Sequence, residues 1–240
     1  MEKKITKKDV ICIICARSGS KGLKDKNILK INDIPLIAYP IIQAKKSKKV
    51  GTVLVTTDSK KIAKIAKHYG AVVPFIRPKS LAKDNTTTEK TLKHALLTYE
   101  KIVNHKFKIG VYLSASDFCR NKKWIDQSIS KLIQDDKIES VFSGHKTHKN
   151  FWEFKNKSWK RLKRSMKTYS SRQIKKPIVR EDTGLTCASR ARLWRNGKRI
   201  GDKVEILLND DSFTSLDIHT KDDLKLAKAA LKIKGIKNFI

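Results

Sequence analysis

Apolar and polar residues follow one another along the chain in blocks that predict alternating strands and helices. The run Val10–Ala16 is wholly apolar, short and rich in β-branched residues, which predicts a strand buried on both faces. Similar runs predict strands at Val50–Thr56, Ala71–Ile76, Ile109–Leu113 and Ser140–Ser143. Arg17, Asp58 and Arg77 come shortly after three of these strands, where functional groups gather in parallel sheets.

Segments between the strands carry apolar residues at helical spacing. Helices are predicted at Pro35–Lys46, Lys60–Tyr69, Lys122–Gln134 and Lys221–Lys232. A further helix is predicted to begin at Thr86, with Glu89 completing a capping box. The alternation predicts a three-layer α/β fold, in which helices flank a mainly parallel sheet.

The pattern changes between residues 144 and 183, which we interpret as an inserted subdomain between core segments 1–143 and 184–240. Phe151–Leu162 predicts a hairpin that turns at Asn156, and its aromatic residues are typical of an interface. His145 and His148 lack neighbouring Cys or carboxylate residues, so we interpret them as core or interface residues and not as a metal pair.

Composition excludes several classes of protein. No apolar run approaches the roughly 20 residues that span a bilayer, and no signal peptide is recognisable, so we expect a cytoplasmic protein without membrane contact. Cys12 and Cys15 lie within the first strand and are interpreted as core residues. The net charge of +32 comes mainly from lysines spread over every helix, which argues against nucleic acid as a partner but leaves nucleic-acid binding as an alternative function.

The loop after the first strand carries the most distinctive chemistry. It combines flexible backbone at Gly19 and Gly22 with four cations, which are Arg17, Lys21, Lys24 and Lys26. Glycines let main-chain N–H groups approach an anion closely, and the cations add charge-assisted hydrogen bonds. The loop therefore predicts a polyphosphate site.

The spacing A-R-S-G-S-K-G-L-x-x-K-N resembles the signature of the CMP-sugar synthetases, cytidylyltransferases that activate sialic acid and related 3-deoxy-2-ulosonic acids. The stretch Arg77–Asp84 is similar to the R-P-x-x-L-A-x-D segment of that family. The resemblance implies a nucleotide-diphospho-sugar transferase fold with a protruding dimerisation arm, and hence a homodimer. It also implies that CTP is bound by Ala16, Arg17, Ser18, Gly19, Ser20, Lys21, Gly22, Lys26, Asn27, Arg77, Ala82 and Asp84.

The resemblance also extends to the acceptor side, with departures. Ser114 stands where the family has Gln, and Asp182 or Thr183 stands where it has Asn. Arg172 and Gln173 match the family's S-R-Q run, and the planar guanidinium of Arg172 suits a carboxylate. The resemblance thus implies that a sugar acid is bound by Ser114, Lys149, Arg172, Gln173 and Asp182, with Arg172, Arg77 and Asp217 converging on one edge of the sheet.

Phe213–Thr220 is similar to the family's S-I-D-I-D-T segment, in which two aspartates on a strand hold the catalytic metal. Asp217 matches the first aspartate, and His219 replaces the second, although Mg²⁺ prefers oxygen ligands. We hypothesise that Asp217 and Asp117 hold Mg²⁺, which leaves His219 beside the metal to act as a base or to orient the acceptor.

The resemblance implies that the anomeric hydroxyl of a 2-keto-3-deoxy sugar acid attacks the α-phosphorus of CTP and expels pyrophosphate. Arg17, Lys21, Lys26 and Asp217 would be the catalytic residues. A sialic-acid-like nonulosonic acid is the first expectation for the acceptor. An octulosonic (Kdo-like) acid or another sugar remains an alternative within the class, and a basic nucleic-acid-binding protein remains the alternative outside it.

Overall fold

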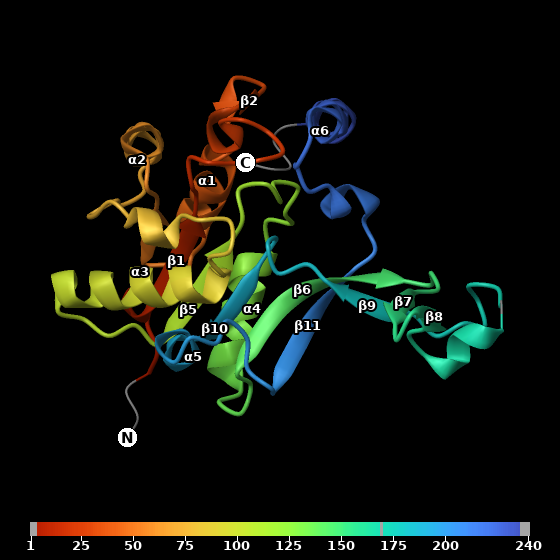
Figure 1. Ribbon diagram of the computed structural model, residues 1–240. Coiled ribbons are helices and arrows are strands. Elements are labelled where there is room, and N and C mark those ends of the chain that lie inside the picture. The colour runs from red at the N-terminus through yellow and green to blue at the C-terminus, as the bar shows by residue number, and fades with distance from the viewer. Residues whose placement is uncertain (1–3, 169, 236–240) are drawn as a thin grey trace.

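The computed structural model describes residues 4–168 and 170–235, which form a seven-stranded sheet with helices on both faces (Figure 1). The path of the sheet is β11 (Val204–Asn209), β6 (Ser140–Thr147), β10 (Cys187–Arg190), β5 (Ile109–Leu113), β1 (Val10–Cys15) and β4 (Thr52–Thr56). A seventh strand, β9 (Ile178–Glu181), pairs with β6 beyond this path. β1 is parallel to β4 and β5, and β11 is parallel to β6, whereas β10 and β9 are antiparallel to their partners. The predicted fold class is confirmed.

Side chains of β1 alternate between two cores, because successive residues of a strand point to opposite faces. Cys12 and Ile14 pack in the core under α1 (Ala38–Lys46), α2 (Lys60–His68) and α4 (Trp124–Gln134). Ile11 and Ile13 pack in the core under α3 (Thr88–Val103) and α5 (Ala191–Arg195). Cys12 is fully buried and not disulfide-bonded, as its interpretation as a core residue requires.

A third core fastens the C-terminal helix to the loop that follows β1. Ala227, Ala230 and Leu231 of α6 (Lys221–Lys234) pack against Leu23 and against the short hairpin of β2 (Lys30–Ile31) and β3 (Ile34–Pro35). Thr220 caps α6 in a capping box with Asp223. Residues far apart in the sequence therefore enclose the same loop.

The predicted strands and helices are found with three corrections. Ala71–Ile76 forms only an isolated bridge between Val72 and Leu54, because Pro74 has no N–H to extend a ladder. Phe213–Thr220 is not a strand, since the Asp211 side chain accepts a hydrogen bond from the Phe213 N–H and starts a 3-10 helix at Ser212–Ser215. Strands β10 and β11 were not among the predicted elements.

The third correction concerns the start of α3. Thr87 caps this helix by accepting from the Lys90 N–H, so Glu89 is not at the third position and no capping box forms. Pro40 is tolerated in the first turn of α1, where its missing N–H has no helical acceptor. In the described part of the chain, no helix has both the length and the apolar character needed to cross a membrane.

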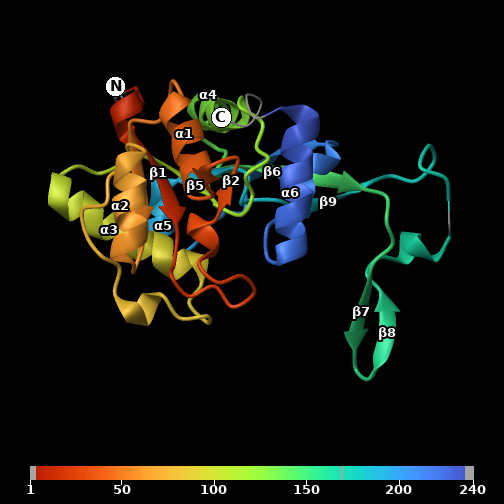
Figure 2. The same cartoon turned by 90° about the horizontal axis from the view of Figure 1, so that it is seen from above.

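An arm projects from one end of the sheet and carries the predicted hairpin (Figure 2). Its strands are β7 (Trp152–Lys155) and β8 (Ser158–Arg161), and the turn uses left-handed backbone at Asn156 and Lys157. β6 extends past residue 143 to Thr147, so the core and the predicted subdomain share one strand. The predicted core segments 1–143 and 184–240 and the predicted subdomain 144–183 include residues 1–3, 169 and 236–240, which lie outside the described residues.

Candidate active site

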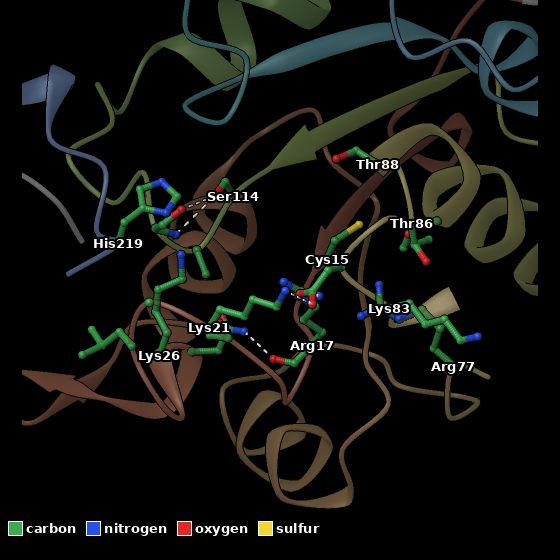
Figure 3. A pocket seen from close by; sticks show the side chains of 18 of the residues that line it. Cys15, Arg17, Lys21, Lys26, Arg77, Lys83, Thr86, Thr88, Ser114 and His219 are labelled. Atoms are coloured by element: carbon green, nitrogen blue, oxygen red, sulfur yellow. Dashed lines mark hydrogen bonds and ion pairs between the residues drawn. The ribbon is translucent and has the colours of Figure 1, made fainter. Parts of the chain in front are cut away.

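A cavity of about 400 Å³ opens where β1 and β5 end. The loop after β1 and the segment between Arg77 and Thr91 form two of its walls, and Tyr112–Ser116 form a third. In Figure 3 the labelled polar side chains other than Thr88 lie in three groups, namely Lys26, Ser114 and His219, then Arg17 and Lys21, then Arg77, Lys83 and Thr86. Five of these side chains are cations of arginine or lysine, so the cavity suits an anion.

Two side-chain anchors shape the loop after β1. Asp58, just after β4, accepts hydrogen bonds from the Ser18 N–H (2.9 Å) and the Ser18 hydroxyl (2.6 Å). Asn27 donates from Nδ2 to the Arg17 carbonyl at 2.9 Å. Gly22 lies so close to the segment before α6 that a Cβ there would stand 2.6 Å from the His219 carbonyl oxygen. Any larger residue at position 22 would therefore displace one of these two backbones.

Arg77 supplies a buried cation to the cavity wall. The residue is 4% exposed, and its Nε has no hydrogen-bond partner among the described residues. Burial lowers the pKa of the guanidinium, against the opposing effects of Cys15 and Asp58. A buried, incompletely paired guanidinium is costly without a ligand, which favours a polar group of a bound molecule at this position.

A second cavity of about 530 Å³ adjoins the first. The two share Thr88, Tyr112, Ser114 and Ser116 as a common wall. Arg180 donates to both carboxylate oxygens of Asp182, at 2.7 and 3.0 Å. Arg199 pairs with Glu181 at 2.9 Å and with Glu89 at 3.2 Å. Of the charged residues that line the second cavity, Arg180 is therefore paired with Asp182 and Arg199 with Glu181.

Two carboxylates interact electrostatically along the second cavity. Burial raises the pKa of Asp117 to about 6, and the negative charge of Asp217 adds to the rise. A Cβ at Gly184 would stand 2.1 Å from Asp117 Oδ2, so any larger residue there would have to displace the carboxylate. Burial lowers the pKa of Lys26, and the charges of Asp217 and Asp117 act in the opposite direction. The charge of Asp217 thus acts on both Asp117 and Lys26.

Asp217 fits a metal ligand better than His219 does. Its Oδ1 is buried without a hydrogen-bond partner among the described residues, while its Oδ2 lies 2.6 Å from His219 Nε2. Mg²⁺ is commonly bound by one or two carboxylates together with substrate phosphates, and Asp117 and Asp217 can supply these carboxylates. The described residues contain no group of three or more His, Cys, Asp or Glu residues arranged to hold a metal. The predicted set of Asp117, Asp217 and His219 is therefore not preassembled.

The structure brings most of the predicted site residues to these two cavities. The first is lined by Arg17, Ser20, Lys21, Gly22, Lys26, Asn27, Arg77, Asp84, Ser114 and His219, and the second by Ser114, Asp117, Asp182 and Asp217. The remaining predicted nucleotide-binding residues, Ala16, Ser18, Gly19 and Ala82, do not line the first cavity. Ala16 is buried in the core, and the Ala82 carbonyl lies 3.4 Å from Arg17 Nη1.

The predicted acceptor residues of the arm lie elsewhere. Lys149 and Arg172 line a third cavity of about 630 Å³, which shares no lining residue with the other two. Gln173 is exposed and lines none of the three. Within this chain, Arg172 does not converge with Arg77 and Asp217, because the arm turns away from the sheet edge (Figure 2). A role for Arg172 in acceptor binding stays a prediction.

Sequence reasoning missed two groups of the site. Arg199 comes from the connection between α5 and β11, which carries no recognisable motif. Tyr112 lies within β5 and was interpreted only as part of a strand. The signal that could have found Tyr112 is its place near the carboxyl end of a parallel strand, next to Ser114.

A mainly parallel α/β sheet with a cationic, glycine-containing loop after its first strand, beside a pair of carboxylates, defines a nucleotidyltransferase. The family model described as "Cytidylyltransferase" matches residues 11–193, and the chain belongs to this family.

The chain is similar along nearly its whole length to two proteins of Campylobacter. It is 32% identical over 231 residues to the "Post-translational flagellin modification protein B" of Campylobacter coli. It is also 32% identical over 231 residues to the "CMP-N,N'-diacetyllegionaminic acid synthase" of Campylobacter jejuni. Each match covers 95% of this chain and 97% of the relative.

Solved structures show the same fold. A CMP:2-keto-3-deoxy-manno-octonic acid synthetase complexed with CTP superposes with a TM-score of 0.65 at 15% identity, covering 94% of this chain and 99% of that one. A cytidylyltransferase from Leptospira borgpetersenii superposes with a TM-score of 0.62 at 20% identity, covering 96% and 90%. Both identities are low, so these neighbours establish the fold alone.

Proposed function

We propose that this cytidylyltransferase couples CTP to a nonulosonic acid of the legionaminic or sialic type, giving a CMP-sugar and pyrophosphate. The observation that carries the proposal is the common wall of the two cavities at Thr88, Tyr112, Ser114 and Ser116. A nucleotide in the cationic cavity and a polyol in the polar cavity would meet at this wall. The anomeric hydroxyl oxygen of the acceptor then bonds to the α-phosphorus and loses its proton as the bond to pyrophosphate breaks.

The nucleotide is assigned to the first cavity. Arg17 and Lys21 hold the pyrophosphate end, where negative charge accumulates as the bond breaks, and Lys26 reaches the phosphate nearer the acceptor. Arg77, buried at the other side of the cavity, faces the cytidine. Asn27 acts by holding the Arg17 carbonyl and with it the loop.

The acceptor is assigned to the second cavity. A nine-carbon acid is favoured over an octulosonic acid because the full-length relative of stated activity is a CMP-N,N'-diacetyllegionaminic acid synthase, whereas the octonic acid enzyme shares only the fold. Shorter matches point the same way, since the chain is 33% identical over 125 residues to a pseudaminic acid cytidylyltransferase of Campylobacter jejuni. Ser114, Asp182 and the unforeseen Arg199 line the space for its substituents.

Mg²⁺ is proposed as the cofactor, with Asp217 and Asp117 as its protein ligands. When bound, the metal neutralises phosphate charge and makes the attacking hydroxyl more acidic. The support is the unpartnered Oδ1 of Asp217 and the electrostatic coupling of the two carboxylates. His219, held against Asp217 and exposed to the first cavity, orients the ligand pair or the acceptor.

The arm is proposed to join two copies of this chain. One face of the hairpin exposes Trp152, Phe154 and Trp159, which are 47%, 63% and 66% exposed. Phe154 and Trp159 lie opposite each other on the two strands of the hairpin, and their ring centroids are 5.3 Å apart. Large exposed aromatic residues on a projecting element favour burial against a partner.

Pyrophosphate release tests the proposal directly. The full chain is incubated with Mg²⁺, each of the four ribonucleoside triphosphates, and a panel of legionaminic, pseudaminic, neuraminic and octulosonic acids. Release with CTP and a nine-carbon acid is the expected result. Equal release from every nucleotide, or none with any acid, contradicts the proposal. Salt-sensitive binding to single-stranded nucleic acid without turnover would support the alternative class instead.

A further inference from the structure

Asp84 places a carboxylate between Arg17 and Lys21 in the lining of the first cavity. Its Oδ1 lies 2.7 Å from Arg17 Nη1, and its Oδ2 lies 2.9 Å from Lys21 Nζ. Each carboxylate oxygen therefore takes one cation. Hydrogen bonds from Lys21 and Arg17 lower the pKa of Asp84, so the group is charged at neutral pH.

This arrangement is unusual within its surroundings. Among the described residues that line the cavity, Asp84 is the one carboxylate, and five cations of arginine and lysine line the same cavity. The Asp84 side chain is 46% exposed, so it can turn away into solvent without leaving a buried charge. A carboxylate offers Arg17 and Lys21 the same kind of charge-assisted hydrogen bond that a phosphate oxygen offers.

We propose that Asp84 is an exchangeable internal anion, which the pyrophosphate end of CTP displaces from Arg17 and Lys21 and which takes these cations back as pyrophosphate leaves. The proposal rests on the proposed function, because it assumes that a polyphosphate occupies this cavity. It gives Asp84 a role opposite to that of a group that binds nucleotide. Asp84 weakens polyphosphate binding and thereby favours release of the product.

Whether removal of Asp84 strengthens or weakens polyphosphate binding distinguishes this competing role from a structural one. If Asp84 only holds Arg17 and Lys21 in place for the ligand, its removal weakens binding of polyphosphates. If it competes with them, its removal strengthens binding, because two ion pairs no longer have to be broken. Two exposed ion pairs of ordinary strength correspond to roughly a three- to tenfold change in affinity.

Isothermal titration calorimetry on the full chain decides whether Asp84 competes with polyphosphates or only holds Arg17 and Lys21 in place. Asp84→Asn is compared with wild type, with Asp84→Glu, which keeps the charge, and with Asp222→Asn. Asp222 lies on α6, is 81% exposed and pairs with Lys225, so this control changes the net charge equally without touching the cavity. The ligands are inorganic pyrophosphate, CTP and CMP.

We expect Asp84→Asn to bind pyrophosphate and CTP roughly three- to tenfold more tightly. We expect unchanged affinity for CMP, which has no pyrophosphate end, and wild-type affinities for Asp222→Asn, whereas Asp84→Glu, which keeps the charge, should bind pyrophosphate more weakly than Asp84→Asn. In turnover, inhibition by added pyrophosphate should strengthen in Asp84→Asn by the same factor. Equal or weaker pyrophosphate binding by Asp84→Asn overturns the proposal. Absence of both CTP and pyrophosphate binding in wild type overturns the proposed function itself, and the two failures are thus distinguishable.

Discussion

His219 Nε2 lies 2.6 Å from Asp217 Oδ2, and the two side chains meet although their segment forms no strand. The contact occupies one oxygen of Asp217 and leaves the buried Oδ1 without a partner among the described residues. His219 is held from its other side, because its backbone N–H donates to Asp223 Oδ2 at 2.9 Å. The helix that begins after Thr220 therefore positions the histidine that replaces a carboxylate.

This relationship predicts opposite outcomes for its two members. Asp217→Asn should lower turnover by a factor on the order of 10² or more, because it removes the charge of a carboxylate that we propose as a Mg²⁺ ligand. His219→Asp should keep or increase turnover in Mg²⁺, since an oxygen ligand replaces an imidazole. Pyrophosphate release at saturating CTP measures both. His219→Asn is the control that removes the ring without adding charge, and full activity of Asp217→Asn contradicts the metal assignment.

Gly22 and Gly19 form a matched pair within the loop after β1. An added Cβ at Gly22 would stand 2.6 Å from the His219 carbonyl oxygen, whereas one at Gly19 meets nothing within 4 Å. We expect Gly22→Ala to raise the KM for CTP by roughly tenfold or more, because the loop must move away from the segment before α6. Gly19→Ala should change KM less than about twofold. Steady-state kinetics with thermal unfolding of both variants tests this, and equal effects at the two positions contradict it.

Asp117 predicts a pH dependence of stability. Since burial and Asp217 raise its pKa to about 6, the native state holds this proton more tightly than the unfolded chain. The stability linked to the protonated form is present in full below about pH 4 and is lost as the pH rises through the raised pKa.

The test compares wild type with Asp117→Asn by urea unfolding without divalent metal at about pH 5 and about pH 8. The free energy of unfolding of wild type should fall by about 1–3 kcal/mol relative to the variant over this interval. Asp222→Asn, a substitution on the exposed surface of α6, should run parallel to wild type. If Asp117→Asn also runs parallel, Asp117 is not a buried, destabilised carboxylate.

The hairpin of the arm predicts the oligomeric state. Replacing Phe154 and Trp159 together by Ser should convert a dimer into a monomer while the unfolding temperature of the core stays close to that of wild type. The physical reason is that these rings pack on each other and are mostly exposed in the single chain. Light scattering coupled to gel filtration measures the mass. Glu153 and Lys160 face each other on the opposite side of the hairpin, so Lys160→Ala should remain dimeric. A monomeric wild type contradicts the role of the arm.

Local pattern was sufficient for much of the fold. The two-sided burial of β1, the helices α1, α2, α4 and α6, and the turn at Asn156 follow from residue spacing and backbone preference, which act within a few neighbours. The strand predicted at Ala71–Ile76 failed where Pro74 interrupts an apolar run. β10 escaped prediction because its four residues, Cys187–Arg190, carry no alternation long enough to read.

The sequence by itself determined the candidates for anion binding, because the spacing of Arg17, Lys21 and Arg77 can be recognised along the chain. Only the tertiary structure decided how these groups are held and opposed. Asp58 accepts a hydrogen bond from Ser18, and Asp84 forms ion pairs with Arg17 and Lys21. Asp117 interacts electrostatically with Asp217, which lies 100 residues away in the sequence. These contacts form because the parallel sheet brings the ends of distant strands to one edge. Electrostatic interactions depend on distance in space, which spacing along the chain does not contain.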